Sequence, residues 1–138
     1  MLKHISSEFQ HGPAEKMSGL SLQLAEPVTQ EFVTKMINFF KTNQCKNIVP
    51  LKTCRKIISD SEKVLCQMPS LLEIDVAEDE DIVIVGDIHG QLFDLLNILD
   101  LVGEPTKKKK FIFNGDFVDR GAWGMECLLI LLGNCRKS

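Results

Sequence analysis

The sequence predicts an α/β fold preceded by helices, and three observations carry this prediction. Residues 82–85 (IVIV) and 111–113 (FIF) are short apolar runs typical of buried parallel strands. Each run is followed by a loop rich in glycine and charge, and each loop is followed by an apolar stretch of helical length. Strand, loop and helix, repeated twice, form the opening of an α/β sheet, which we place in residues 70–138.

Composition limits the classes of partner. The chain has 138 residues, 44% of them hydrophobic, and its net charge is −3 at pH 7, which offers no general attraction to nucleic acid or to an anionic membrane. No run approaches the roughly 20 apolar residues of a membrane span, and the first residues lack the apolar core of a secretory signal. We therefore expect no nucleic acid and no membrane as partners, and an intracellular location, cytoplasmic with the nucleus as a second compartment.

Helical patterns occupy residues 27–69, after a leader of mixed polar composition, residues 1–26, to which we assign no function. The first helix is predicted from Val28 onward, with Thr29 as its cap, because apolar residues return at helical spacing. These apolar residues are Phe32, Met36, Phe39 and Phe40.

A second helix is predicted from Pro50, a residue tolerated in the first turn, to Pro69. The spacing of its apolar residues predicts a buried face, and the two helices could then pair as an antiparallel hairpin. This face comprises Leu51, Cys54, Ile58, Leu65 and Met68.

The next segment, residues 71–76, alternates apolar and acidic residues, which predicts a strand with one wet face. The acidic stretch 77–81 and the lysine run 107–110 are interpreted as solvated turns. Helices are predicted for residues 91–103, closed by Gly103, and from about Trp123 to Leu132.

Candidate metal ligands follow the two predicted strands. Asp87 and His89 come directly after the first strand, and Asp116 follows the second. In open α/β sheets the functional crevice lies at the carboxyl ends of the strands, so we expect these side chains to converge. Two carboxylates and an imidazole suit manganese, iron or zinc.

A phosphate site is predicted beside these ligands. The carboxylate of Asp116 could bridge two ions about 3.5–4 Å apart, an arrangement used in phosphoryl displacement. Arg120, four residues later, offers a planar fork of donors that matches phosphate oxygens. Taken singly, each feature has a structural alternative: the aspartates could cap helices, and Asp119 with Arg120 could be a turn ion pair. Two such loops at successive strand ends favour the functional interpretation.

The two loops, GDIHG at 86–90 and GDFVDRG at 115–121, resemble the first two motifs of the metal-dependent phosphoprotein phosphatases, GD-x-HG and GD-x-VDRG. The wider context, from about Val28 to Leu132, looks most like the type-5 protein serine/threonine phosphatase branch. The resemblance implies the N-terminal part of a calcineurin-like metallophosphoesterase sandwich. The tetratricopeptide repeats that usually precede the domain in that branch are expected to be absent.

The resemblance also implies an activity, the hydrolysis of phosphoserine and phosphothreonine in phosphoprotein substrates by a metal-activated water. By motif match, Asp87 and His89 would hold the first of two divalent ions, Asp116 would bridge both, and Arg120 would bind the phosphate. Asp119 would orient the catalytic histidine of a third motif, GNHE. The chain reads GNCRKS from residue 133 and contains no GNHE.

We therefore expect a truncated chain with little or no activity of its own, carrying only the first-metal ligands and the bridging aspartate. Residues 128–132 should form an exposed apolar run. This run, or the helical lead-in formed by residues 27–69, could bind a protein partner. One alternative is a non-enzymatic binding or regulatory fragment. Another is a small-molecule metallophosphoesterase, which the NGDFVDRG context and the helical lead-in disfavour.

Overall fold

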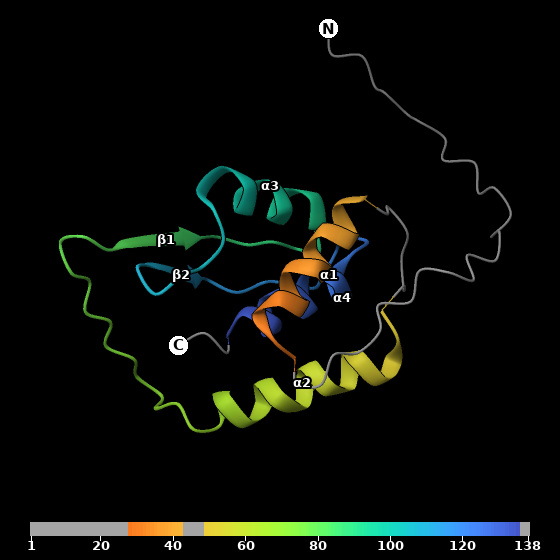
Figure 1. The fold of residues 1–138 in the computed structure, drawn as a ribbon, viewed down its shortest axis with the longest axis horizontal. Helices are drawn as coiled ribbons and strands as arrows, with labels where there is room; N and C mark the ends of the chain where they lie inside the picture. Colours follow the sequence, from red (N-terminus) through yellow and green to blue (C-terminus); the bar gives the residue numbers. More distant parts are fainter. Residues whose placement is uncertain (1–27, 43–48, 136–138) are drawn as a thin grey trace, which may run out of the picture.

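The computed structural model describes residues 28–42 and 49–135, and it confirms the predicted α/β order (Figure 1). Strands β1 (Asp81–Val85) and β2 (Lys109–Phe113) pair in parallel, with Val85 opposite Phe113. Helix α3 (Leu92–Val102) connects them and ends at Gly103, whose φ of 82° a residue with a side chain rarely adopts. The leader, residues 1–26, lies outside the described residues.

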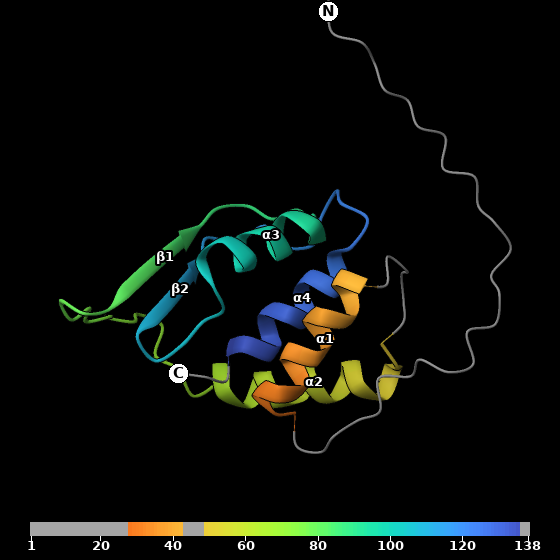
Figure 2. The same cartoon turned by 45° about the horizontal axis from the view of Figure 1, so that its top comes forward.

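The lead-in forms two helices, α1 (Gln30–Thr42) and α2 (Leu51–Leu65), as predicted. Thr29 caps α1, since its Oγ1 accepts a hydrogen bond from the backbone N–H of Phe32 at 3.2 Å. The predicted hairpin is wrong, however. Each helix packs against α4 (Gly124–Asn134), and the two make no close backbone contact with each other (Figure 2). Helix α4 therefore separates the two lead-in helices and joins them to the α/β unit.

The predicted buried face of α2 is also wrong. Leu51, Ile58 and Leu65 are exposed, whereas the side of the helix that carries Thr53, Ile57, Asp60 and Ser61 is buried. The buried side of α2 makes a specific polar contact with α4. Ser61 Oγ lies 2.9 Å from the carbonyl oxygen of Leu132 and 2.8 Å from that of Ile57 in its own helix. Apolar periodicity alone does not reveal such a contact.

The apolar run 128–132 is covered, which corrects the expected exposed patch. Leu129 and Ile130 are fully buried, and the other three residues are half-buried, because α1 and α2 pack on α4. The approach of α1 is close: a Cβ on Gly133 would lie 2.9 Å from a methyl group of Val33. Part of the predicted interaction surface is therefore internal to the chain.

The predicted strand over residues 71–76 does not form, and Leu72, Ile74 and Val76 are exposed in an irregular segment. Strand β1, expected to be buried on both faces, has one covered face. Val83 and Val85 contact the core, whereas Ile84 is 73% exposed. Among the described residues the sheet has two strands. The alternation of strands and helices in this part of the chain therefore covers one face of β1 and leaves the other face open.

The acidic stretch and the lysine run pair with each other. Asp79 lies 2.5 Å from Lys108, and Glu80 lies 2.6 Å from Lys110. The last two lysines of the run begin β2, so the run is part loop and part strand. Within residues 28–42 and 49–135, no helix has the length and apolar character needed to cross a membrane.

Candidate metal centre

Both glycine-rich loops leave the sheet at the carboxyl ends of their strands. Backbone hydrogen bonds join the two loops: the N–H of His89 donates to the carbonyl of Asp116 at 2.7 Å, and that of Gly90 donates to Phe117 at 2.9 Å. The N–H of Gly121 in turn donates to the carbonyl of His89 at 2.8 Å. The loops therefore form one hydrogen-bonded unit, which fixes the relative positions of their side chains.

The last glycine of each motif is required by this contact. A Cβ on Gly121 would lie 2.0 Å from the carbonyl oxygen of His89, and a Cβ on Gly90 would lie 3.0 Å from the backbone of Gly121. Gly90 also has a φ of 65°. By contrast, a Cβ on Gly86 would meet nothing within 4 Å. Two of the motif glycines thus allow the loops to touch.

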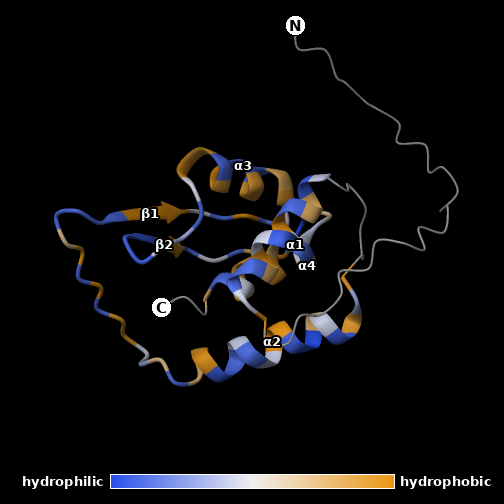
Figure 3. Cartoon of the chain, in the orientation of Figure 1, coloured by the Kyte–Doolittle hydropathy of each residue, from blue (hydrophilic) through white to orange (hydrophobic). Residues whose placement is uncertain are grey.

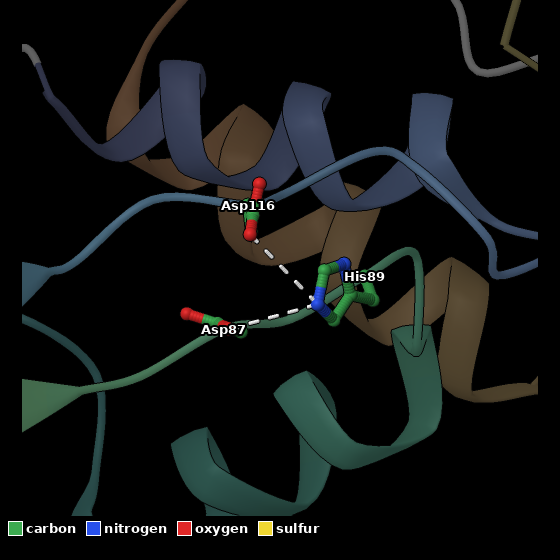
Figure 4. Close-up of side chains that lie close together, drawn as sticks. All are labelled: Asp87, His89 and Asp116. Carbon is green, nitrogen blue, oxygen red and sulfur yellow. Dashed lines mark ion pairs between the residues drawn. The ribbon is translucent and has the colours of Figure 1, made fainter.

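The three predicted ligands converge. One ligand atom from each of Asp87, His89 and Asp116 lies within 4.8 Å of the others. His89 Nε2 is 3.6 Å from an oxygen of Asp87 and 3.9 Å from an oxygen of Asp116, and the dashed lines in Figure 4 join this nitrogen to the two aspartates. The aspartate side chains are more than half exposed, so the cluster is open to solvent.

Two of these residues have unusual backbone conformations. His89 has a φ of 48° and Asp116 a φ of 46°, in the left-handed region that side chains other than glycine seldom adopt. Each such residue costs roughly 1–3 kcal/mol and persists where its surroundings determine it. The interloop hydrogen bonds supply those surroundings, because the carbonyl of Asp116 accepts the N–H groups of both Ile88 and His89.

Asp119 forms a hydrogen bond with His89, one of the three candidate metal ligands. Its Oδ1 is 2.6 Å from Nδ1 of His89, whereas the resemblance had implied contact with a GNHE histidine. This hydrogen bond holds the pKa of the Asp119 carboxyl below its usual value, and the Arg120 charge acts in the same direction. The motif match had not pointed to this contact, because it depends on the hydrogen bonds that join the two loops, which no local sequence signal shows.

Arg120 lies beside this pair. Its Nε is 3.3 Å from Oδ2 of Asp119, and its side chain is 78% exposed. The backbone φ of Arg120 is 67°, the third positive value among residues with side chains in the described part of the chain. The guanidinium is therefore near the cluster, and its remaining donors are accessible to an anion from solution.

The donor set fits a divalent metal ion. A metal-binding histidine commonly donates its second ring N–H to a carboxylate, which fixes the tautomer and leaves the other nitrogen free for the metal. Here Nδ1 faces Asp119 and Nε2 faces the two carboxylates. Mixed oxygen and nitrogen ligands are typical of sites for manganese, iron and zinc.

Two protein families match the chain. Residues 81–136 match the calcineurin-like phosphoesterases, and residues 6–73 match the family described as the PPP5 TPR repeat region. The second match covers the whole helical lead-in, residues 27–69. It also takes in most of the leader, for which no role was predicted.

Named relatives and a solved structure agree with these matches. The chain is 46% identical over 109 residues to serine/threonine-protein phosphatase T of Schizosaccharomyces pombe, covering 78% of this chain and 22% of that protein. It is 39% identical over 106 residues to serine/threonine-protein phosphatase 5 of Arabidopsis thaliana, covering 77% of this chain and 19% of that protein. A solved Saccharomyces cerevisiae protein serine/threonine phosphatase with similarity to human phosphatase PP5 superimposes with a TM-score of 0.67 at 38% identity, over 75% of this chain and 33% of that chain.

Proposed function

The chain is a relative of the metal-dependent phosphoprotein phosphatases, of the type-5 branch in particular, and from this premise we propose that it carries the first-metal half of a phosphoserine and phosphothreonine phosphatase site. The chain spans about a fifth of the length of the curated relatives it matches. The observation that carries the proposal is the convergence of Asp87, His89 and Asp116 at the ends of β1 and β2.

Each residue of the site has a distinct task in this proposal. Asp87 and His89 bind one divalent ion, manganese, iron or zinc, and Asp116 binds the same ion with its second carboxylate oxygen free for another. Arg120 binds the substrate phosphate through its exposed guanidinium. A bound divalent ion acts as a Lewis acid toward phosphate oxygens and makes water more acidic.

We propose that the 138-residue chain by itself binds metal and phosphate but hydrolyses phosphate esters only slowly. Two ions stabilise both the attacking and the leaving oxygen of a phosphoryl displacement, and the second ion needs ligands of its own. The histidines besides His89 are His4 and His11, and both lie outside the described residues. Proton transfer to the leaving group also needs an acid, which commonly contributes a factor of about 10²–10⁴ in rate.

The proposed substrates are phosphoproteins, and the proposed location is the cytoplasm, with the nucleus as a second compartment. The names of the relatives support a protein substrate over a small molecule. The match to the PPP5 TPR repeat region supports a capacity for protein interaction in the lead-in.

A binding experiment tests this function. In the presence of Mn²⁺, fluorescence anisotropy should show that the chain binds a phosphoserine peptide more tightly than the unphosphorylated peptide. Arg120→Ala should abolish this preference while leaving Mn²⁺ affinity unchanged. Equal binding of both peptides, or an unaltered preference in Arg120→Ala, would contradict the proposal, as would faster turnover of a dinucleotide polyphosphate than of the phosphopeptide.

A further inference from the structure

An aromatic contact lies where the two loops of the metal site lead into helices. Phe93 is the second residue of α3, and Trp123 immediately precedes α4. Their ring centroids are 5.6 Å apart at an interplanar angle of 76°, an edge-to-face arrangement that aromatic rings favour. In Figure 2 the two helices begin at the same end of the described residues, and Figure 3 shows α3 as largely apolar. The contact therefore joins the segments that follow the two loops.

Trp123 is also joined to the first loop through its backbone. Its N–H donates to the carbonyl oxygen of Gly90 at 3.1 Å. The chain then passes close to the second loop, because a Cβ on Gly124 would lie 2.6 Å from the carbonyl oxygen of Val118. Trp123 is thus held to the first loop by its backbone and to α3 by its ring.

The candidate ligands depend on support of this kind. His89 and Asp116 have positive φ angles, which persist only where surrounding contacts determine them. His89 lies between β1 and Phe93, and Asp116 lies between β2 and Trp123. The side chains of Asp87 and Asp116 are more than half exposed, so their own packing contributes little to their positions. Their positions are therefore set by what holds the two loops together.

We propose that Phe93 and Trp123 are positioning residues for the metal site. The contact between their rings keeps the second loop against the first, and so sets the arrangement of Asp87, His89 and Asp116 that binds the ion. Neither ring is a ligand, and each acts through the loop beside it. This inference rests on the proposed function, because it takes these three residues as metal ligands.

Mn²⁺ affinity, measured by isothermal titration calorimetry, tests the proposal. Trp123→Ala and Phe93→Ala should each lower the affinity by about threefold to tenfold, the range that loss of an edge-to-face contact gives. Trp123→Phe and Phe93→Tyr keep a ring and should bind nearly as the parent chain does. The double variant Phe93→Ala/Trp123→Ala should bind no more weakly than the weaker single variant, because both substitutions remove the same contact.

Phe39→Ala is the matched control. Phe39 makes an edge-to-face contact with Phe40, at 6.3 Å and 62°, within α1, a helix that contributes no residue to either loop. This variant should lower the free energy of unfolding in urea but leave the Mn²⁺ affinity unchanged. A loss of affinity in Trp123→Ala without one in Phe39→Ala then separates positioning from a general loss of stability.

The outcomes distinguish this inference from the proposed function. Phe93 is 43% exposed, so Phe93→Ala leaves the core intact and carries the test by itself if circular dichroism shows that Trp123→Ala is unfolded. Parent-like Mn²⁺ affinity in Phe93→Ala, an equal loss in Phe39→Ala, or no recovery in Phe93→Tyr overturns the inference and leaves the metal site in place. A parent chain that binds no Mn²⁺, or that binds it as tightly with His89→Ala, overturns the proposed function and this inference with it.

Discussion

Oδ1 of Asp119 lies 2.6 Å from Nδ1 of His89, so the second motif positions the histidine of the first. Nδ1 is directed at Asp119 and Nε2 faces the carboxylates of Asp87 and Asp116, the orientation in which a histidine can offer Nε2 to a metal ion. Both loops thus contribute to the position of His89, which depends on Asp119, a residue outside the candidate ligand set.

Removal of this support should weaken metal binding. Asp119→Ala is expected to lower Mn²⁺ affinity by roughly 10–100-fold in isothermal titration calorimetry, because His89 loses the partner that fixes its ring and tautomer. Asp119→Asn, which keeps an acceptor oxygen, should lose less. Asp75→Ala, at an exposed aspartate remote from the two loops, is the control and should bind as the parent chain does. Unchanged affinity in Asp119→Ala would show that the contact has no role.

A side chain added at Gly121 should disrupt the contact between the two loops. Gly121→Ala places a methyl group 2.0 Å from the carbonyl oxygen of His89, so the loops must separate. The expected cost is about 1–3 kcal/mol in free energy of unfolding, together with loss of Mn²⁺ binding. Gly86→Ala in the same loop region, where a Cβ meets nothing within 4 Å, should be tolerated in both assays. Similar losses in the two variants would contradict this account of the motif glycines.

Packing of the lead-in on α4 can be tested through thiol reactivity. Cys127 is fully buried, and burial raises the pKa of its thiol to about 12, so iodoacetamide at pH 8 should leave it unmodified. Exposed Cys66 should react under the same conditions, and both should react in guanidinium chloride. Peptide mapping by mass spectrometry gives the extent of labelling at each site. Equal labelling of Cys66 and Cys127 in the native chain would mean that α4 is not covered.

Much of the α/β unit could be predicted from the sequence, because its signals are local. Apolar β-branched residues mark β1, Gly103 ends α3, and the two glycine-rich loops fall at strand ends. The convergence of Asp87, His89 and Asp116 follows from this order, since parallel strands carry their carboxyl ends to the same edge.

Burial of the lead-in could not be predicted in the same way. The apolar spacing of α2 favoured Leu51 and Ile58 as core residues, but tertiary packing instead buries Ser61, which contacts the backbone of α4. The strand predicted over 71–76 failed for a related reason, since alternation requires a neighbouring strand that the local sequence does not specify. The pairing of Asp119 with His89 likewise depends on contact between loops.

The ion pair between Glu80 and Lys110 predicts a pH dependence of stability. The hydrogen bond from Lys110 lowers the pKa of the Glu80 carboxyl from its ordinary 4.5. A lowered pKa in the folded state stabilises the protein above the ordinary pKa, and this contribution disappears as the pH falls through the lowered value.

Glu80→Gln should therefore melt slightly below the parent chain at pH 7, and the difference in Tm should shrink below pH 4.5. Differential scanning fluorimetry at several pH values measures it, with Glu78→Gln as the control at an exposed neighbour. A difference that grows on acidification would have the wrong sign for this ion pair.

The most direct test of the central claim is a Mn²⁺ titration followed by electron paramagnetic resonance, which separates bound from free ion. The site predicts one bound Mn²⁺ per chain, lost in His89→Ala and in Asp116→Ala and retained in Asp75→Ala. If His89→Ala bound Mn²⁺ as tightly as the parent chain, the ion would lie elsewhere, for example on the acidic residues 77–81, and the assignment of the metal centre would be wrong.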